Sequence, residues 1–534
     1  MTDITEVIGV CEWVAKRTTD FSAKVYKDGD RVYAVDSDGK TIAEGEAGVD
    51  DASVIQSALY FIKDKHSRGL LFITNGEYDL KGNVIQLTDV RDISAINNLK
   101  IKGAGIDKTV IKNGGFRKPT TSSTNVAEEE ENNPQAYNVE IEDMTIDVNN
   151  TADINAINLT GYSYNYKLRR LKLMNTNNRF LLEWHDVDNL LVEDVIFYNA
   201  GLGGNYDMAA GNQLYDSEGR TVFRNCWFIQ DEGNIGGMLT TGGTGNLLID
   251  GCTFIDNTDA RYAAISIENT FGAVKDIQVV NCRAYGAHAE IDIGNGTDNQ
   301  IEKGTIYGCI STGRQRIMNA KEAIISDSII FNSVYGFHLR DNHVAKLINC
   351  IVKNTDYYRS GTYTSLKGGV YIDNNDYVEI IGLHVYDDQA TPSTTYGLYG
   401  SSEYIFISNS IFEGGFTKEA VALGSGSVLK WTGGKVNGSV FSGTFTAEKT
   451  IKYVSGYQTH NSGTATFSGD GSTTQFSITH CLVSTPTKVQ VTAMSEDASG
   501  DFYVTADATY IYVNYKTAPP SGTDNIKLSW YAEV

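Results

Sequence analysis

The sequence predicts an all-β protein built on a right-handed, single-stranded parallel β-helix of about 13 coils. Three observations support this fold class. A short apolar pattern recurs about every 27 residues between residues 101 and 436, its segments alternate between apolar and polar residues, and its turns hold mostly Gly, Asn or Asp. We expect a capping helix before the coils and a small antiparallel β-domain after them.

The repeat consists of an apolar strand residue, a polar or glycine turn, and a second apolar residue five positions after the first. Residues 141–146, 192–197 and 223–228 are clear copies. Because these segments lack the period of a helix, each copy is expected to form two short strands joined by a tight corner. The corner residues tolerate left-handed backbone, as such a corner requires. They are Gly103, Asp143, Asp194, Asn225, Gly251, Asn281, Asp327, Asn349, Gly382 and Asn409.

Cysteines follow the corner in five coils, at Cys226, Cys252, Cys282, Cys309 and Cys350. Metal binding is one interpretation of this column. In other coils the same position holds Ala104, Met144, Val195 and Leu383, none of which is a zinc ligand. The sequence therefore predicts a stack of small apolar side chains inside the solenoid. We expect neither a metal nor a cofactor.

Residues 50–66 are predicted to form a helix that covers the open N-terminal end of the coils. Either Asp50 or Asp51 can cap this helix, and its apolar face consists of Ile55, Ala58, Leu59 and Ile62. A strand at residues 70–74 follows, and then a G-x-Y turn.

This arrangement resembles the pectate-lyase-like superfamily, in which a D-D-x-x-x-I-Q-x-A-[IL] helix caps the β-helix before a strand and a G-x-Y turn. The matching residues here are Asp50, Asp51, Ile55, Gln56, Ala58, Leu59, Gly76 and Tyr78. The resemblance implies the fold over roughly residues 48–450 and does not specify any chemistry.

The chain is expected to have three parts. Residues 1–47 contain a small hairpin-like unit with DGD and DSDG turns, residues 48–450 form the β-helix, and residues 451–534 form a C-terminal β-domain. The last part has alternating strands joined by Gly/Ser/Pro turns, with TAPPSGT before the final strand. This layout resembles the C-terminal β-domains of β-helical tail proteins of phages and archaeal viruses, which implies a domain for oligomerisation or binding.

The charge of the chain narrows the choice of partners. A formal net charge of −22 argues against nucleic acid or an anionic membrane, because both are bound through basic patches. No run of apolar residues is long enough to span a bilayer, and the start MTDITEVIGV lacks the pattern of a signal peptide. We therefore expect no nucleic acid, no membrane and no standard secretion signal.

One face of the predicted coils can be aligned closely. Residues 26 positions apart are expected to stack inward: Leu239, Ile265, Ile291 and Ile317. The residues after them should point outward, as should those two positions further on. The first outward row is Thr240, Ser266, Asp292 and Met318, and the second is Gly242, Glu268, Gly294 and Ala320.

On this alignment Glu268 and Asp292 lie on neighbouring strands, with their backbones about 8 Å apart. Two carboxylates at roughly 5–9 Å can act in glycoside hydrolysis, one as the acid and one as nucleophile or base. The small residues Gly242, Ser266, Gly294 and Ala320 would leave room for a sugar ring. The alternative is that the exposed strands of an acidic protein carry carboxylates without a catalytic role.

Continuing the alignment places a mixed set of charged and aromatic residues on the same face. His338, Arg340, Tyr371 and Asp373 are the predicted substrate-binding residues, and Tyr371 can stack against a sugar ring. The polygalacturonase pattern NTD…DD…GHG…RIK is not present, and we find no calcium cluster of the kind that pectate lyases carry.

Together these features predict a virion tailspike- or tail-fibre-type protein that recognises a host-surface glycan. Whether it also cleaves the glycan, as a hydrolase or a lyase, stays open. The resemblance to tail proteins implies a homotrimer attached to the virion or tail base through its N-terminus. The alternatives are a free extracellular polysaccharide-degrading enzyme and a structural surface or filament protein.

Overall fold

The computed structural model describes residues 21–534 except 90, 92–93, 119–135, 160–162, 178, 186, 204–206, 213–216, 233–234, 242–243, 259–262, 268–274, 287–288, 295–300, 356–367, 425, 439 and 441–448. The described chain is mostly β-strand and forms two compact units, Met1–Ile324 and Ile325–Val534. Among the described helices, none has the length and apolarity to cross a membrane.

A three-stranded antiparallel meander precedes the coils. It consists of β1 (Ala23–Asp28), β2 (Arg31–Asp36) and β3 (Thr41–Glu46), which pair in sequence order. Strand β1 also pairs in parallel with β4 (Gly69–Ile73), the strand that follows the helix. The N-terminal hairpin unit therefore extends the same sheet as the first coil.

Helix α2 (Asp51–Lys65) forms where the sequence predicts it, and its apolar face is fully buried. The carboxylate of Asp51 is also buried, where it pairs with Lys27 at 2.8 Å and accepts a 2.7 Å hydrogen bond from the backbone N–H of Asp79. The expected side-chain cap is wrong, because the Asp50 carboxylate accepts from the backbone N–H of Glu46 instead. Apolar packing and the Asp51 contacts thus fasten α2 to the first coil.

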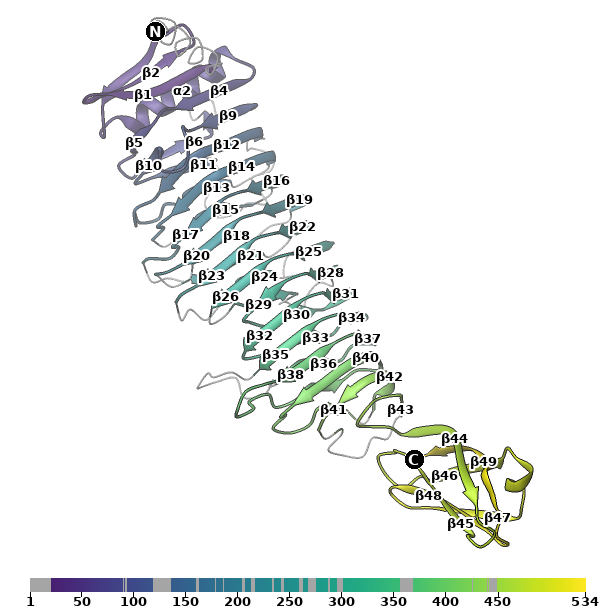
Figure 1. Ribbon diagram of the computed structural model, residues 1–534. Helices are drawn as coiled ribbons and strands as arrows, with labels where there is room; N and C mark the ends of the chain where they lie inside the picture. Colours follow the sequence, from purple (N-terminus) through teal and green to yellow (C-terminus); the bar gives the residue numbers. More distant parts are fainter. Residues whose placement is uncertain are drawn as a thin grey trace, which may run out of the picture. The chain divides into compact units, whose positions relative to one another are not determined.

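In the first unit each full coil adds two strands to sheet A, one on either side of the corner, and one strand to sheet B (Figure 1). Sheet A contains β5 (Gly76–Asp79), β9 (Leu99–Lys102), β10 (Thr109–Lys112), β12 (Ala136–Asp147), β14 (Ser163–Met174), β16 (Val187–Glu193), β17 (Ile196–Tyr198), β19 (Ser217–Arg224), β20 (Trp227–Gln230), β22 (Thr244–Asp250), β23 (Thr253–Asp256), β25 (Asp276–Val280), β26 (Arg283–Gly286), β28 (Ile301–Tyr307) and β29 (Ile310–Ser311). Sheet B contains β6 (Val84–Gln86), β11 (Gly115–Lys118), β13 (Ile157–Leu159), β15 (Leu182–Trp184), β18 (Asp207–Asn212), β21 (Ile235–Thr241), β24 (Ile265–Ile267), β27 (Ile291–Ile293) and β30 (Gln315–Met318). A separate short pair is β7 (Thr88–Asp89) with β8 (Ser94–Ala95).

The second unit repeats the coil and ends in a different domain. Its sheet A strands are β32 (Ile329–Ser333), β34 (Val344–Ile348), β35 (Ile351–Thr355), β37 (Tyr377–Ile381), β38 (His384–Asp387), β40 (Tyr404–Gly414), β42 (Val428–Val436) and β43 (Lys449–Lys452), and β31 (Ala320–Ser326) spans the unit boundary. Its sheet B strands are β33 (Phe337–Arg340), β36 (Val370–Asp373), β39 (Leu398–Ser401) and β41 (Val421–Leu423).

The C-terminal domain has two three-stranded antiparallel sheets. One has the order β44 (His460–Gly469), β49 (Gly522–Glu533), β46 (Lys488–Ala493), and the other β45 (Gln475–Thr479), β48 (Tyr510–Tyr515), β47 (Phe502–Ala506). The short helix η1 (Glu496–Ala498) precedes β47. Phe476, Ile511 and Leu528 belong to the domain's own apolar core. The predicted fold class is confirmed: within the described residues sheet B has 13 strands, one for each coil.

The corner residues explain how the chain turns between the two strands of sheet A. Nine of the ten predicted corners have left-handed backbone, with φ between 48° at Asn409 and 65° at Gly251. Gly103 is the exception. Arg170 is a corner that was not predicted: its φ is 47°, and its guanidinium is held by the carboxylate of Asp143 at 2.6 Å, in the preceding coil. An ion pair can therefore hold in place a residue type that rarely adopts this conformation.

Apolar columns fill the interior of the coils, as the cysteine pattern predicts. The five cysteines of the column are buried free thiols. Nearby, Phe228 stacks on Phe197 and on Phe254, with ring centroids 4.4 and 4.6 Å apart. Identical positions in successive coils thus contact one another because the strands are in parallel register.

Candidate functional site

The outward column of sheet B is the row of residues that follow the inward apolar residue of each strand. In the first unit the strand register aligns Arg117, Asn158, Glu183, Gly211, Thr240, Ser266, Asp292 and Arg316. In the second unit it aligns His338, Tyr371, Tyr399 and Ala422. The alignment predicted for Thr240, Ser266 and Asp292 on adjacent strands is confirmed.

The predicted alignment fails at its fourth coil. Ile291 pairs with Gln315, so Arg316, and not Met318, lies beside Asp292. Ile317 pairs with Ile293 and is two positions away from its predicted place. The reason is that this coil is two residues shorter than the expected 26. Coils change length in their loops, where the alternation of apolar and polar residues gives no information about register.

The middle of the column is covered, which contradicts the open surface expected there. All three residues of β24 and all three of β27 are buried. Ala320 is also buried, at the first position of β31. A Cβ at Gly294, where φ is 83°, would lie 2.1 Å from the carbonyl oxygen of Met318, so this glycine permits close backbone approach. Gly242 and Glu268 lie outside the described residues.

Asp292 is the centre of a buried ion-pair cluster. Its side chain is 5% exposed and accepts hydrogen bonds from Arg314, at 3.1 Å to Oδ1 and 2.7 Å to Oδ2. The Arg316 guanidinium donates to the same Oδ2 at 2.9 Å, and Arg314 also pairs with Glu290 at 2.9 Å. Both oxygens of Asp292 are therefore engaged, and the side chain is not open to a substrate in this arrangement.

The second unit brings three of the four predicted binding residues to an accessible face. Strands β33 and β36 pair so that His338 lies beside Tyr371 and Arg340 beside Asp373. The Arg340 guanidinium is 3.0 Å from Asp341 and 3.7 Å from Asp373. His338 differs from the prediction, because it is 4% exposed and packs against Tyr371 with a centroid distance of 4.7 Å.

Tyr371 belongs to a row of rings, which we call the aromatic platform: His338, Tyr371, Tyr399 and Tyr396. Tyr371 stacks on Tyr399 with centroids 4.6 Å apart, and Tyr399 stacks on Tyr396 at 5.1 Å. The Lys418 ammonium lies 5.4 Å from the Tyr396 centroid. Burial raises the pKa of Tyr371 to about 12, and a hydrogen bond to Asp373 adds to the rise. The platform thus combines neutral phenol rings with charged groups at its edge.

Tyr396, Tyr399 and Lys418 were missed at the level of the sequence. A signal for one of them was present: Tyr371 and Tyr399 each follow an apolar residue, Val370 and Leu398, in strands one coil apart. Tyr396 and Lys418 lie outside the strands, so their approach to Tyr399 depends on loop paths that the repeat does not encode.

A second polar cluster lies near the start of the column. The carboxylate of Glu183 accepts hydrogen bonds from His185 at 3.1 Å, Asn155 at 2.5 Å and Asn158 at 2.7 Å. Burial alone would raise the pKa of Glu183, but the hydrogen bonds from His185 and Asn155 outweigh it and hold the pKa below its usual value. Glu183 is therefore a fixed acceptor that orients its neighbours.

The cysteine column does not offer thiolates to a ligand. Burial raises the pKa of the Cys350 thiol to about 12 and those of Cys252, Cys282 and Cys309 well above their usual value. Among the described residues no group of three or more His, Cys, Asp or Glu side chains is arranged to hold a metal ion.

No protein-family model and no curated protein matches the chain. Similar solved structures include the tailspike gp61 of Pseudomonas phage phi297, at 10% identity and TM-score 0.43, covering 90% of this chain and 92% of that one. A mutant tailspike of E. coli bacteriophage HK620 in complex with a pentasaccharide matches at 13% identity and TM-score 0.49, covering 94% and 92%. The gp54 tailspike of Acinetobacter baumannii bacteriophage AP22, in complex with a capsular saccharide, matches at 11% identity and TM-score 0.35, covering 90% and 94%.

These solved structures are parallel β-helix proteins, the class to which the fold of this chain corresponds. Identities of 10–13% and TM-scores below 0.5 do not transfer a function from one protein to another.

Proposed function

We propose that this protein binds a polysaccharide along sheet B of its second unit, and that it serves as a tailspike- or tail-fibre-type attachment protein for a host-surface glycan. The observation that carries the proposal is the aromatic platform with Arg340 and Asp373 beside it. Sugars are held by stacking on aromatic rings and by charged hydrogen bonds to their hydroxyl groups. A parallel sheet repeats such groups about every 4.8 Å, which suits a polymer.

Within this proposal the predicted binding residues have different roles. Tyr371 and Tyr399 provide ring surface, and Arg340 and Asp373 provide a donor and an acceptor for sugar hydroxyls. His338 is covered, so its part is to support the ring of Tyr371. The C-terminal domain, which has its own core, is proposed to hold three chains together, and the N-terminal meander to attach to the virion or tail base.

The proposal is tested by binding of the full-length protein to an array of bacterial lipopolysaccharides and capsular polysaccharides. Tyr371→Ala and Arg340→Ala should each weaken binding of the best glycan about 5- to 30-fold, since a stacked ring or a charged hydrogen bond contributes roughly 1–2 kcal/mol. Tyr404→Ala is the matched control, because this exposed tyrosine lies on sheet A of the same unit.

Unchanged glycan binding in both platform variants would show that this face is not the binding site. Binding of no glycan on the array would favour a structural surface or filament protein instead. Release of reducing ends or unsaturated products from the bound polysaccharide would add cleavage to the proposed function.

A further inference from the structure

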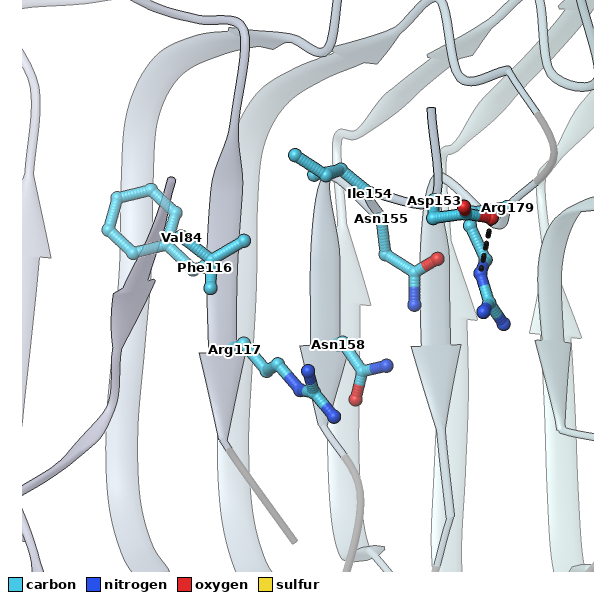
Figure 2. A pocket seen from close by; sticks show the side chains of 8 residues that line it. All are labelled: Val84, Phe116, Arg117, Asp153, Ile154, Asn155, Asn158 and Arg179. Carbon is cyan, nitrogen blue, oxygen red and sulfur yellow. Dashed lines mark ion pairs between the residues drawn. The ribbon is translucent and has the colours of Figure 1, made fainter. Parts of the chain in front are cut away.

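The pocket drawn in Figure 2 lies at the start of the outward column, in the first unit, and has a volume of about 110 Å³. Its ring and its amides are out of reach of a ligand, because the side chain of Phe116 and the Oδ1 atoms of Asn155 and Asn158 are buried. The Nδ2 groups of both amides donate to Oε2 of Glu183. Arg117 is exposed, but without an accessible ring or amide beside it this charge does not make a sugar site. We therefore assign no ligand to this pocket.

The C-terminal domain, in contrast, has a sheet whose polar and aromatic side chains are accessible. Its strands are β45, β48 and β47, and their inward residues, such as Phe476, Ile511 and Val504, form or pack against the domain core (Figure 1). On the outward side the register places Gln475, Asn514 and Tyr503 in one row and Ser477, Tyr512 and Thr505 in the next. A third row pairs Thr479 with Tyr510. We call these outward residues the tyrosine face.

The rings of the tyrosine face are open to solvent along its length. Tyr503 is 60% exposed and Tyr510 is 38% exposed. The rings of Tyr510 and Tyr512 lie side by side, with centroids 6.0 Å apart. From the rise along a strand and the spacing between strands, the backbone of Tyr503 is about 8 Å from that of Tyr512 and about 14 Å from that of Tyr510. A ligand on this face can therefore contact rings at both ends of it.

Hydrogen bonds hold several side chains of the tyrosine face in place. The Tyr512 hydroxyl donates to Asp507 at 2.8 Å, which fixes its ring. Gln475 Nε2 donates to Oδ1 of Asn514 at 2.8 Å, and Asn514 Nδ2 donates to the carbonyl oxygen of Tyr512 at 3.2 Å. The orientation of the Gln475 amide leaves its Oε1 atom, which accepts no hydrogen bond from a described residue, available to a ligand.

The tyrosine face carries no charge, which restricts the ligands that suit it. None of its outward residues is ionised at neutral pH, whereas the outward face of the other sheet of the domain carries Lys488 and Lys527. Asp507 is engaged by Tyr512, and just beyond the face Lys516 pairs with Asp501 at 3.4 Å. An ionic ligand would thus find no unpaired opposite charge here, so a neutral ligand is favoured.

The composition of the tyrosine face also distinguishes it from a contact between copies of the chain. Interfaces that hold subunits together permanently are rich in apolar residues. The tyrosine face has no outward Val, Leu, Ile, Phe or Met, and combines phenol rings with amide and hydroxyl groups. Rings and neutral hydrogen-bonding groups side by side are the combination that sugars need.

We propose that the tyrosine face binds a neutral saccharide chain. The C–H faces of its sugar rings stack on Tyr503 and Tyr510. Its hydroxyl groups donate to Oε1 of Gln475 and form hydrogen bonds with the Thr505 hydroxyl. The site is separate from the aromatic platform, because it lies on a different sheet, and it does not depend on whether the platform binds a glycan.

The test is a titration of the full-length protein with three tetrasaccharides, followed by calorimetry and ligand-observed NMR. Cellotetraose and mannotetraose are the neutral probes, and tetragalacturonate is the acidic counterpart. We expect at least one neutral probe to bind at least about fivefold more tightly than tetragalacturonate. Tyr503→Ala and Gln475→Ala should each weaken its binding at least about threefold and leave the unfolding midpoint unchanged, since both side chains are exposed.

Tyr531→Ala is the matched control, since Tyr531 is 39% exposed on the outward face of the other sheet of the domain. Binding of neither neutral probe, or equal binding by wild type and Tyr503→Ala, would overturn the inference. So would a change from trimer to monomer in Tyr503→Ala, because it would assign the face to a contact between copies. If Tyr371→Ala leaves polysaccharide binding intact, the proposed function fails, while the effect of Tyr503→Ala on tetrasaccharide binding still decides this inference.

Discussion

The substitution Asp292→Asn tests whether the Asp292 carboxylate has a structural or a catalytic role. Asparagine has nearly the same shape but loses the negative charge and one acceptor oxygen. In the structure Asp292 faces two guanidiniums, Arg314 and Arg316, whose side chains are 14% and 12% exposed. Removing the charge therefore takes a negative partner away from two largely buried cations, while Glu290 still pairs with Arg314.

The magnitude follows from this burial. Breaking a buried ion pair by removing one partner destabilises by about 3–5 kcal/mol. Because Glu290 still pairs with Arg314 and the asparagine keeps one acceptor, we expect the lower end, about 3 kcal/mol. Asp250→Asn is the matched control, because the Asp250 side chain is 34% exposed and lies 3.8 Å from Arg224. Loss of the Asp250 charge should therefore change the free energy of unfolding by only about 0–1 kcal/mol.

Hydrogen exchange in the native protein is the suitable assay, because it reports local opening and does not require the long solenoid to unfold in one step. Amides of β27 and β30 should exchange about 100-fold faster in Asp292→Asn, and amides of β22 should be nearly unchanged in Asp250→Asn. Exchange at the wild-type rate would refute the structural role. If polysaccharide cleavage is detected and falls at least about 100-fold while exchange is unchanged, Asp292 takes the catalytic role that the sequence predicts for it with Glu268.

Three further predictions concern the interior, the acid stability and the assembly. The five buried cysteines should react with a thiol reagent far more slowly than exposed Cys481, and fast labelling or stoichiometric zinc binding would contradict the core stack. The pKa of Glu183 is lower in the folded state than its usual value of 4.5, so the ionised carboxylate stabilises the fold at pH values above 4.5. This stabilisation is lost as the pH falls through the lower folded-state pKa. The unfolding midpoint of wild type should therefore fall more steeply below pH 4.5 than that of Glu183→Gln, whereas parallel curves would exclude the effect. Light scattering should give the mass of a trimer for the full chain and of a monomer after deletion of residues 460–534, and a monomeric full chain would refute the assembly.

The corners of the coils show which features were predictable and why. Asn, Asp and Gly adopt left-handed backbone at little energetic expense, so a corner rich in these residues is visible in the sequence alone. Arg170 was not visible, because an arginine adopts that conformation here through its ion pair with Asp143 in the preceding coil. The helix cap shows the same limit: the sequence locates α2, but the path of residues 46–50 turns the Asp50 carboxylate toward the N–H of Glu46.

The candidate site, too, was predictable from the sequence in part only. The alternation of apolar and polar residues identifies the outward residues of each strand, so Asp292, Tyr371 and Arg340 were placed on one face before their partners were known. The shorter coil before Gln315 moved Arg316 beside Asp292 and changed an expected open carboxylate into a buried ion pair.

By itself the sequence therefore determined the fold class, the capping helix, the C-terminal β-domain and the face of the coils that carries polar residues. These depend on local backbone preference and on a period of two, both of which are properties of short segments. Only the tertiary structure decided which outward residues are accessible, which rings stack and where Arg117, Asn155 and Asn158 surround a pocket. Those features depend on loop lengths and on contacts between residues a full coil apart, where a shift of one or two positions changes every neighbour.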